Sequence, residues 1–246
     1  MSQRILIDDV TLPADGCQAI AEAIIRGEES AVSNGSYDLK NGTSCFQLAA
    51  TKEETEDRLK AVNWVPGSPI DQSAYRSELT GIVGILATTA IIVQHFGIVT
   101  GGITIALDVE SALDEASGEW SLAIDQTSYD LLQEIRNRVR ALSIDVIWRW
   151  VEGHQKEKGV HNLDSWAQRN DEVVDMANSY FAQCTEAKWL QLPVQLLYEK
   201  WAVYIHRDKQ AKIDKKALYM TLFAPRTINY YKNHHGTRIP AGYAVN

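Results

Sequence analysis

Apolar and polar residues follow two periods along the chain, and the order of these periods predicts a mixed α/β fold. Residues 17–26 carry apolar side chains at helical spacing and are followed by Gly27, which predicts a short helix. Three short β-prone segments come next, at 30–36, 43–50 and 59–64. The Asn41-Gly42 dipeptide between the first two is typical of a tight hairpin, so the sheet should open with antiparallel strands.

Helical and strand patterns then alternate through the rest of the chain. A long apolar-faced helix is expected after the turn-rich Pro-Gly-Ser-Pro segment, followed by an interior strand that is almost entirely apolar. Three hairpin-linked strands followed by this alternation predict a mixed five-stranded sheet flanked by helices. The expected later elements are a helix at 72–94, a strand at 103–107, helices at 111–115 and 129–142, a strand at 144–151 and a helix at 164–181.

The pattern divides the chain into three parts. Residues 1–29 are expected to be an N-terminal lead-in with the short helix, and residues 30–185 the α/β domain. Pro193 marks the expected end of that domain. Residues 194–246 are expected to form a C-terminal extension with one helical stretch near 214–223.

Charge is distributed unevenly between these parts. Residues 200–246 hold nine Lys and Arg against two Asp, a net charge of +7, so the −8 of the whole chain leaves −15 for residues 1–199. A basic arm of this kind can contact a phosphate backbone, although a charge run on a helix is often only a solvated face. The lysines predicted to bind nucleic acid are Lys212, Lys215 and Lys216.

Composition favours an intracellular globular protein. The chain has 246 residues, of which 45% are hydrophobic, enough for a full core. Its longest apolar stretch, 82–96, is interrupted by Gly, Thr, Gln and His, so no membrane span is expected. Residues 1–13 lack the basic and then apolar order of a secretory signal. Three widely spaced cysteines indicate neither a disulfide framework nor a cysteine zinc site.

Polar residues follow or flank the predicted interior strands, where open α/β sheets place their functional sites. Asn34 ends the first strand, Glu78 lies near the start of the long helix, Asp108 ends the fourth strand and His154 follows the fifth. Clustered carboxylates hold hard divalent cations, and two such ions about 4 Å apart can drive phosphodiester hydrolysis. Taken singly, each acid is more often a solvated surface residue.

The same positions resemble the ribonuclease H family. More narrowly, the chain resembles the ribonuclease-H-like domain at the C-terminal end of retroelement polyproteins, over about residues 30–180. The Pro-Gly to Glu-Leu segment is the most specific part, whereas Val-x-Gly-His alone would be weak. The segments that carry the resemblance are 32–37 (VSNGSY), 65–79 (VPGSPIDQSAYRSEL), 129–135 (YDLLQEI) and 151–155 (VEGHQ).

The resemblance implies hydrolysis of the RNA strand of an RNA–DNA hybrid by four acidic residues and two Mg²⁺ (or Mn²⁺), assisted by a histidine. By position, Glu78 matches the acid of the helix, Asp108 the acid of the strand and His154 the histidine of the loop. Ser36, in the Asn-Gly-Ser segment, is expected to contact the nucleic acid. The chain could be part of a larger reverse transcriptase polyprotein.

Two of the four acids are missing in this reading. Asn34 stands where the family has Asp, and an ungapped reading of the last helix puts Val174 in the place of the fourth acid, with Asp175 beside it. A neutral residue weakens the binding of divalent cations, and Asp175 would need a local adjustment of the helix to substitute. The site is therefore predicted to be degenerate and hydrolysis to be impaired.

Two hypotheses of function remain open. The first is a retroelement-type ribonuclease H, active or impaired, that acts on RNA–DNA hybrids. The second is a non-catalytic module that binds nucleic acid or serves as a scaffold. A transposase or integrase of the same fold is disfavoured, because such enzymes lack the Gly153-His154 loop.

Overall fold

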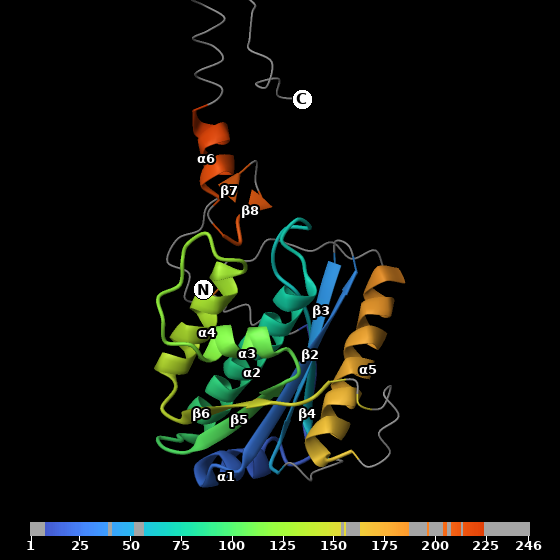
Figure 1. The fold of residues 1–246 in the computed structure, drawn as a ribbon. Helices are drawn as coiled ribbons and strands as arrows, with labels where there is room; N and C mark the ends of the chain where they lie inside the picture. Colours follow the sequence, from blue (N-terminus) through green and yellow to red (C-terminus); the bar gives the residue numbers. More distant parts are fainter. Residues whose placement is uncertain are drawn as a thin grey trace, which may run out of the picture.

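The computed structural model of the chain describes residues 8–38, 41–51, 57–153, 155, 163–186, 196, 204–205, 208–212 and 214–223 (Figure 1). Its helices and strands alternate much as the sequence pattern predicts. In chain order they are β1 (Asp9–Thr11), α1 (Gln18–Arg26), β2 (Glu29–Asp38), β3 (Asn41–Ala49), β4 (Leu59–Trp64), α2 (Ala74–Phe96), β5 (Gly102–Leu107), α3 (Glu110–Ser117), α4 (Tyr129–Ala141), β6 (Asp145–Trp150), α5 (Ser165–Glu186), β7 (Tyr204–Ile205), β8 (Asp208–Lys209) and α6 (Lys215–Leu222).

The main sheet is mixed and has six strands in the order β1-β4-β3-β2-β5-β6. β1 to β4, β4 to β3 and β3 to β2 are antiparallel pairs, whereas β2 to β5 and β5 to β6 are parallel. The predicted α/β class is confirmed, but the predicted count of five strands is wrong by one. The extra strand, β1, has three exposed residues, so it shows no alternating pattern from which it could be recognised. Residues 8–29 therefore contribute both a strand and a buried helix to the domain.

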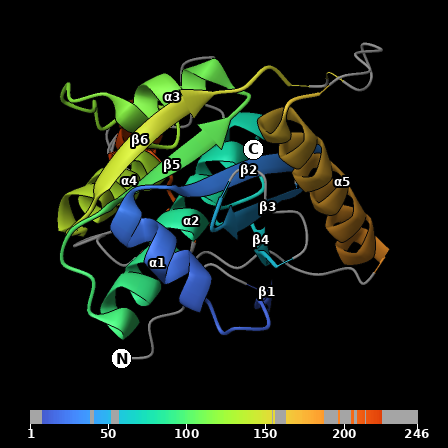
Figure 2. The same cartoon turned by 90° about the horizontal axis from the view of Figure 1, so that it is seen from below.

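Helices cover the two faces of the sheet unequally (Figure 2). α1, α2 and α3 pack on one face, α4 packs on α2, and α5 alone packs on the other face, against β2, β3 and β4. α2 is long and apolar enough to cross a membrane by composition, but 72% of its most apolar window is buried inside the domain. It is therefore the central core helix, and its apolar side chains meet those of α4.

α2 lies so close to β2 that two contacts leave no space for a side chain. A Cβ atom on Gly35 would lie 2.4 Å from the Cβ of Ser77, and one on Gly81 would lie 2.7 Å from the Cβ of Ser33. Atoms packed this tightly cannot accept even one added methyl group without a shift of the backbone. The contact fixes the first turns of α2, which carry Glu78, against the end of β2.

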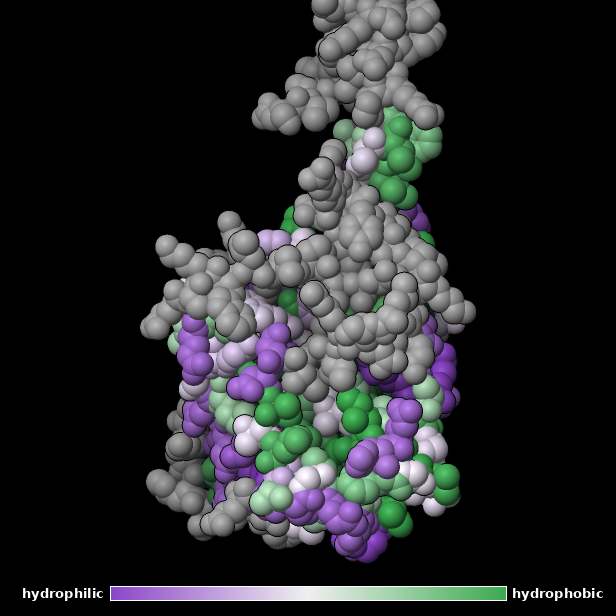
Figure 3. All heavy atoms as spheres, turned by 180° about the vertical axis from the view of Figure 1, so that it is seen from behind, coloured by the Kyte–Doolittle hydropathy of each residue, from purple (hydrophilic) through white to green (hydrophobic). Residues whose placement is uncertain are grey.

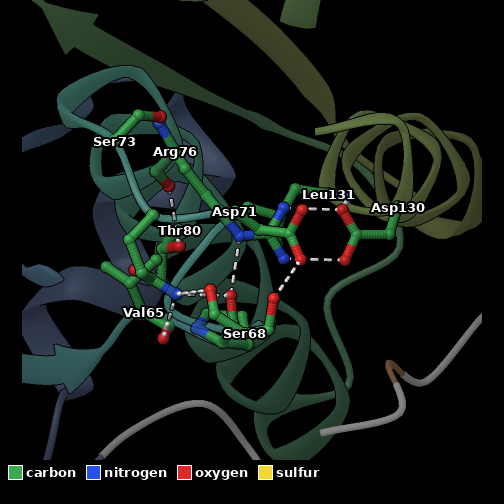
Figure 4. Close-up of polar contacts among 10 residues, drawn as sticks. Val65, Ser68, Asp71, Ser73, Arg76, Thr80, Asp130 and Leu131 are labelled. Carbon is green, nitrogen blue, oxygen red and sulfur yellow. Dashed lines mark hydrogen bonds and ion pairs between the residues drawn. The ribbon is translucent and has the colours of Figure 1, made fainter. Parts of the chain in front are cut away.

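A buried ion pair joins the start of α2 to the start of α4 (Figure 4). Arg76 Nη1 and Nη2 each lie 2.7 Å from one carboxylate oxygen of Asp130, and Arg76 Nε donates to the carbonyl of Pro66 at 2.6 Å. Both side chains are almost completely buried. The backbone N–H of Asp130 donates to the carbonyl of Ala211 at 3.1 Å, so the same point anchors the C-terminal extension.

The outer surface is mixed in character. Seen from behind, the lower part of the molecule exposes hydrophilic side chains around a group of hydrophobic ones (Figure 3). Single exposed apolar residues are ordinary on a globular domain. The buried and free cysteines, Cys17, Cys45 and Cys184, form no disulfide.

The buried ion pair yields the first prediction. Asp130→Asn leaves the Arg76 guanidinium buried without a counter-charge, and this should lower the free energy of unfolding by about 3–5 kcal/mol in urea titrations. Asp125→Asn is the matched control, because Asp125 is exposed in the segment that precedes α4. A change below about 1 kcal/mol for Asp130→Asn would show that the pair contributes little.

Candidate functional site

Three of the predicted site residues meet where β2, β5 and the start of α2 converge. Asn34 lies in β2, Asp108 follows β5 directly and Glu78 lies near the start of α2. The side-chain amide of Asn34 donates from Nδ2 to Asp108 Oδ2 at 3.1 Å. The backbone N–H of Gly35 donates to Glu78 Oε1 at 2.9 Å. The structure thus brings together the Asn, the Glu and the Asp that the sequence singled out.

The fourth residue of the group is Asn170 of α5, which sequence reasoning missed. Its Nδ2 also donates to Asp108 Oδ2, at 3.1 Å, and the residue is 1% exposed. Val174 lies about one helical turn further along α5, so the ungapped reading of this helix chose a position one turn too late. Asp175 is exposed and lines a separate cavity of about 360 Å³ with Asp9, so the structure does not bring it into the group.

Asp108 is held from several sides at once. Its Oδ2 accepts both asparagine amides, and its carbonyl accepts the indole N–H of Trp150 at 3.1 Å. A Cβ atom on Gly153 would lie only 2.4 Å from Asp108 Oδ2, so the segment after β6 can pass this close only as glycine. The contacts fix the orientation of the carboxylate.

Burial changes the acidity of Glu78. Desolvation by burial, and secondarily the negative charge of Asp108, raise the pKa of Glu78 to about 8. The hydrogen bond from Gly35 acts in the opposite direction but is the smallest of the three effects. At neutral pH, Glu78 is therefore mostly protonated, so it adds little negative charge to the group.

The donor set fits at most one divalent cation. Within the described residues, no three His, Cys, Asp or Glu side chains lie close enough together to hold a metal ion. Three buried oxygens of the group have no hydrogen-bond partner there: Glu78 Oε2, Asp108 Oδ1 and Asn170 Oδ1. Carboxylate and amide oxygens are ligands of hard cations, but one amide and two carboxylates do not supply the charge that a pair of dications needs.

The other predicted site residues lie elsewhere or outside the described part. Ser36 is half-buried in β2, two residues after Asn34, and should therefore face the same side of the sheet. His154 lies outside the described residues. The exposed lysines of the extension, Lys212, Lys215 and Lys216, lie at or just before the start of α6. In Figure 1, α6 lies beyond the start of α4, where Ala211 is bound.

Comparison with known proteins gives similarity in fold only. No protein-family model and no curated protein matches the chain. Among solved structures, LC11-RNase H1 in complex with RNA/DNA hybrid, from a compost metagenome, is 12% identical with a TM-score of 0.45 and covers 63% of this chain and 99% of its own. RNase H1 of Halobacterium salinarum NRC-1 is 14% identical with a TM-score of 0.35, covering 59% and 98%. The N-terminal RNase H domain of a Mycobacterium tuberculosis protein is 11% identical with a TM-score of 0.36, covering 58% and 94%.

These similarities concern the fold alone. The antiparallel strands β4, β3 and β2 are followed in the sheet by the parallel strands β5 and β6, and β1 lies at the edge beside β4.

The raised pKa of Glu78 predicts a pH-dependent stability. Between pH 4.5 and 8 the unfolded chain loses the proton that the folded chain keeps, so this group makes the protein less stable as pH rises, by up to about 1.4 kcal/mol per pH unit. Glu78→Gln removes the effect. Urea unfolding should therefore show the variant gaining stability relative to the parent protein between pH 5.5 and pH 8.

Glu110→Gln is the control for this experiment, because Glu110 is exposed at the start of α3. It should leave the pH dependence unchanged. A stability difference between Glu78→Gln and the parent that stays constant with pH would contradict the assignment of a raised pKa to Glu78.

Proposed function

We propose that this chain is a nucleic-acid-binding domain that binds RNA–DNA hybrids and does not cut them by a two-metal mechanism. The observation that carries the proposal is that the amides of Asn34 and Asn170 both donate to Asp108 Oδ2. Both N–H donors bind the same Asp108 oxygen, which leaves only Oδ1 of this carboxylate free, whereas a pair of metal ions would need both oxygens. The two asparagines stabilise the Asp108 carboxylate with hydrogen bonds. In a two-metal hydrolase, cations would stabilise that carboxylate.

Nucleic-acid binding is supported by side chains around the group. Trp150 is half-exposed at the end of β6, and its ring is fixed by the hydrogen bond to the Asp108 carbonyl. A fixed and exposed indole is a good surface on which a base can stack. The exposed lysines at α6 can contact phosphates at a distance from this point.

The choice of a hybrid as the ligand, and the origin of the chain in a retroelement polyprotein, rest on the resemblance of residues 65–79. In the structure this segment includes Pro66 and Arg76, which build the buried contact with Asp130. An intracellular location belongs to the same proposal, because a globular composition with three widely spaced cysteines is typical of a reducing compartment.

One observation favours a second candidate, a weak hydrolase that uses a single cation. The unpartnered oxygens of Glu78, Asp108 and Asn170 are ligands of the kind that Mg²⁺ or Mn²⁺ takes. Glu78 must lose its proton before it can bind a cation, so occupancy should increase as pH rises through about 8. This candidate predicts slow cleavage that increases with pH, whereas the first predicts none.

A binding and cleavage assay separates the two candidates. Purified protein should bind a labelled RNA–DNA hybrid with an affinity that falls steeply with salt, and should leave the RNA strand intact in Mg²⁺ or Mn²⁺. Reversing the charges of Lys212, Lys215 and Lys216 to Glu should weaken binding. Cleavage by the parent protein that is lost in Glu78→Gln would overturn the first candidate, and an absence of binding at low salt would overturn nucleic-acid binding itself.

Restoring the acids tests the role assigned to the asparagines. Asn34→Asp with Asn170→Asp should create tight Mn²⁺ binding, measured by calorimetry, because it adds two carboxylates beside Asp108. Asn34→Asp with Asn178→Asp is the matched control, since Asn178 is exposed on the same helix and its change adds the same charge outside the group. Equal Mn²⁺ binding by the two double variants would show that Asn170 does not form part of the site.

A further inference from the structure

A groove lies on the face of the sheet that carries α5, beside this helix and over strands that it does not cover. α5 packs over β2, β3 and β4, while β5 and β6 extend beyond it (Figure 2). The groove has a volume of about 570 Å³ and is lined by the start of β2, by β5 and β6, and by the start of α5. Its size is that of a pocket for a small organic ligand. Its lining includes Ser30, Thr104, Ile147, Arg149 and Trp166.

One wall of the groove is a stack of a cation on an aromatic ring. The guanidinium carbon of Arg149 lies 5.0 Å from the centre of the Trp166 ring. Arg169 is also close to that ring, at 5.8 Å, but it is buried and donates to Ser30. Arg149 is exposed, and within the described residues its guanidinium donates no hydrogen bond and forms no ion pair.

An exposed guanidinium over a ring has two ways to hold a nucleotide. Its planar face can stack on a base, and its N–H groups can bind a phosphate in a bidentate manner. Holding the guanidinium over Trp166 reduces the freedom it loses when a ligand binds. Arg149 therefore offers a largely pre-formed contact for an anionic ligand with a planar ring.

The floor of the groove is polar and its side is apolar. Ser30 and Thr104 are directly paired across β2 and β5, and Thr104 is paired with Ile147 across β5 and β6. Hydroxyl groups can donate to or accept from a base or a sugar. Glu29 also lines the groove, is completely buried, and has two carboxyl oxygens without a hydrogen-bond partner among the described residues.

The acidic residue does not oppose an anionic ligand. Desolvation by burial raises the pKa of Glu29 to about 8, although the positive charge of Arg169 acts in the opposite direction. Glu29 is therefore mostly neutral at pH 7, which leaves Arg149 as the main charge on the groove wall. Glu28 also lines the groove, but its carboxylate is paired with Arg26 at 2.7 Å.

The groove and the group around Asp108 lie on the same face of β5. Thr104 and Asp108 are four residues apart, so their side chains point to the same side of the sheet about 13 Å from each other. Arg149, paired with Ala106, lies between them along the neighbouring strand. A strand of nucleic acid that passes Asp108 can continue along this face into the groove.

We propose that this groove binds the single-stranded continuation of a nucleic acid whose duplex part lies at the group around Asp108. A base stacks on the Arg149 guanidinium, the adjacent phosphate is held by its N–H groups, and the hydroxyl of Thr104 contacts the base or sugar. The inference rests on the proposed function, because it extends that binding site by a single-stranded arm.

The test compares hybrids with and without a single-stranded overhang. At the stacked spacing of about 3.4 Å per nucleotide, about four nucleotides span the distance from Asp108 to Thr104. Fluorescence anisotropy should show about tenfold tighter binding of a hybrid with a six-nucleotide overhang than of the blunt hybrid, since one stacked base is enough for such a gain. A one-nucleotide overhang should give no gain.

Substitutions at Arg149 assign the gain to the groove. Arg149→Gln should reduce the overhang gain to less than about twofold and leave blunt-hybrid binding unchanged, while Arg149→Lys should restore only part of it, because lysine keeps the charge and loses the planar stack. Arg140→Gln is the matched control, since Arg140 is exposed on α4, on the opposite face of the sheet. It should keep the full gain.

The outcomes distinguish this inference from the proposed function. Two outcomes would overturn the assignment of the groove as a single-strand site and leave the proposed function standing. One is tight blunt-hybrid binding without an overhang gain, and the other is an overhang gain that Arg149→Gln does not reduce. If a free single strand binds in a manner that depends on Arg149 and the blunt hybrid does not bind, the groove is a single-strand site but the hybrid is not the ligand of the domain. Binding of adenosine monophosphate that depends on Arg149, without an overhang gain, would show a nucleotide site and overturn the single-strand assignment.

Discussion

The close contact between α2 and β2 determines where the polar residues of this domain can meet. With glycine at positions 35 and 81, the helix lies against the strand without room for a single methyl group. Glu78 is thereby fixed beside the backbone of Gly35 and within range of Asp108. A side chain larger than glycine at position 35 would push the first turn of α2 away, and the pairing of Glu78 with the strand end would be lost.

Bringing two carboxyl groups together in a buried place is electrostatically unfavourable, and in this chain protonation of one and hydrogen bonds to the other reduce that cost. Glu78 keeps its proton to a pH near 8, and Asp108 receives N–H donors from Asn34 and Asn170. A metal-binding site would need the opposite arrangement, with more negative oxygens and fewer donors. The group around Asp108 thus has more N–H donors and less negative charge than a site for two divalent cations needs.

The ion pair between Arg76 and Asp130 connects this site to the rest of the molecule. It lies only two residues before Glu78 on α2, and its other partner begins α4, where the backbone also binds Ala211 of the extension. Packing of α2 against the sheet, the loop at Pro66 and the anchoring of the basic extension thus meet at one buried point. The segment that leads to the lysines near α6 is held by this contact.

The sequence by itself determined the order of helices and strands, because the apolar period of each segment reflects the face that it buries. It also determined that Asn34, Glu78 and Asp108 would meet, since strand ends and the adjacent helix converge in such a sheet. Only the tertiary structure decided that Asn170, one turn before Val174, faces Asp108, because the direction of a side chain on a helix depends on how the helix is rotated against the sheet. β1 and the groove beside Arg149 were likewise beyond the sequence pattern, since both arise from contacts between segments far apart in the chain.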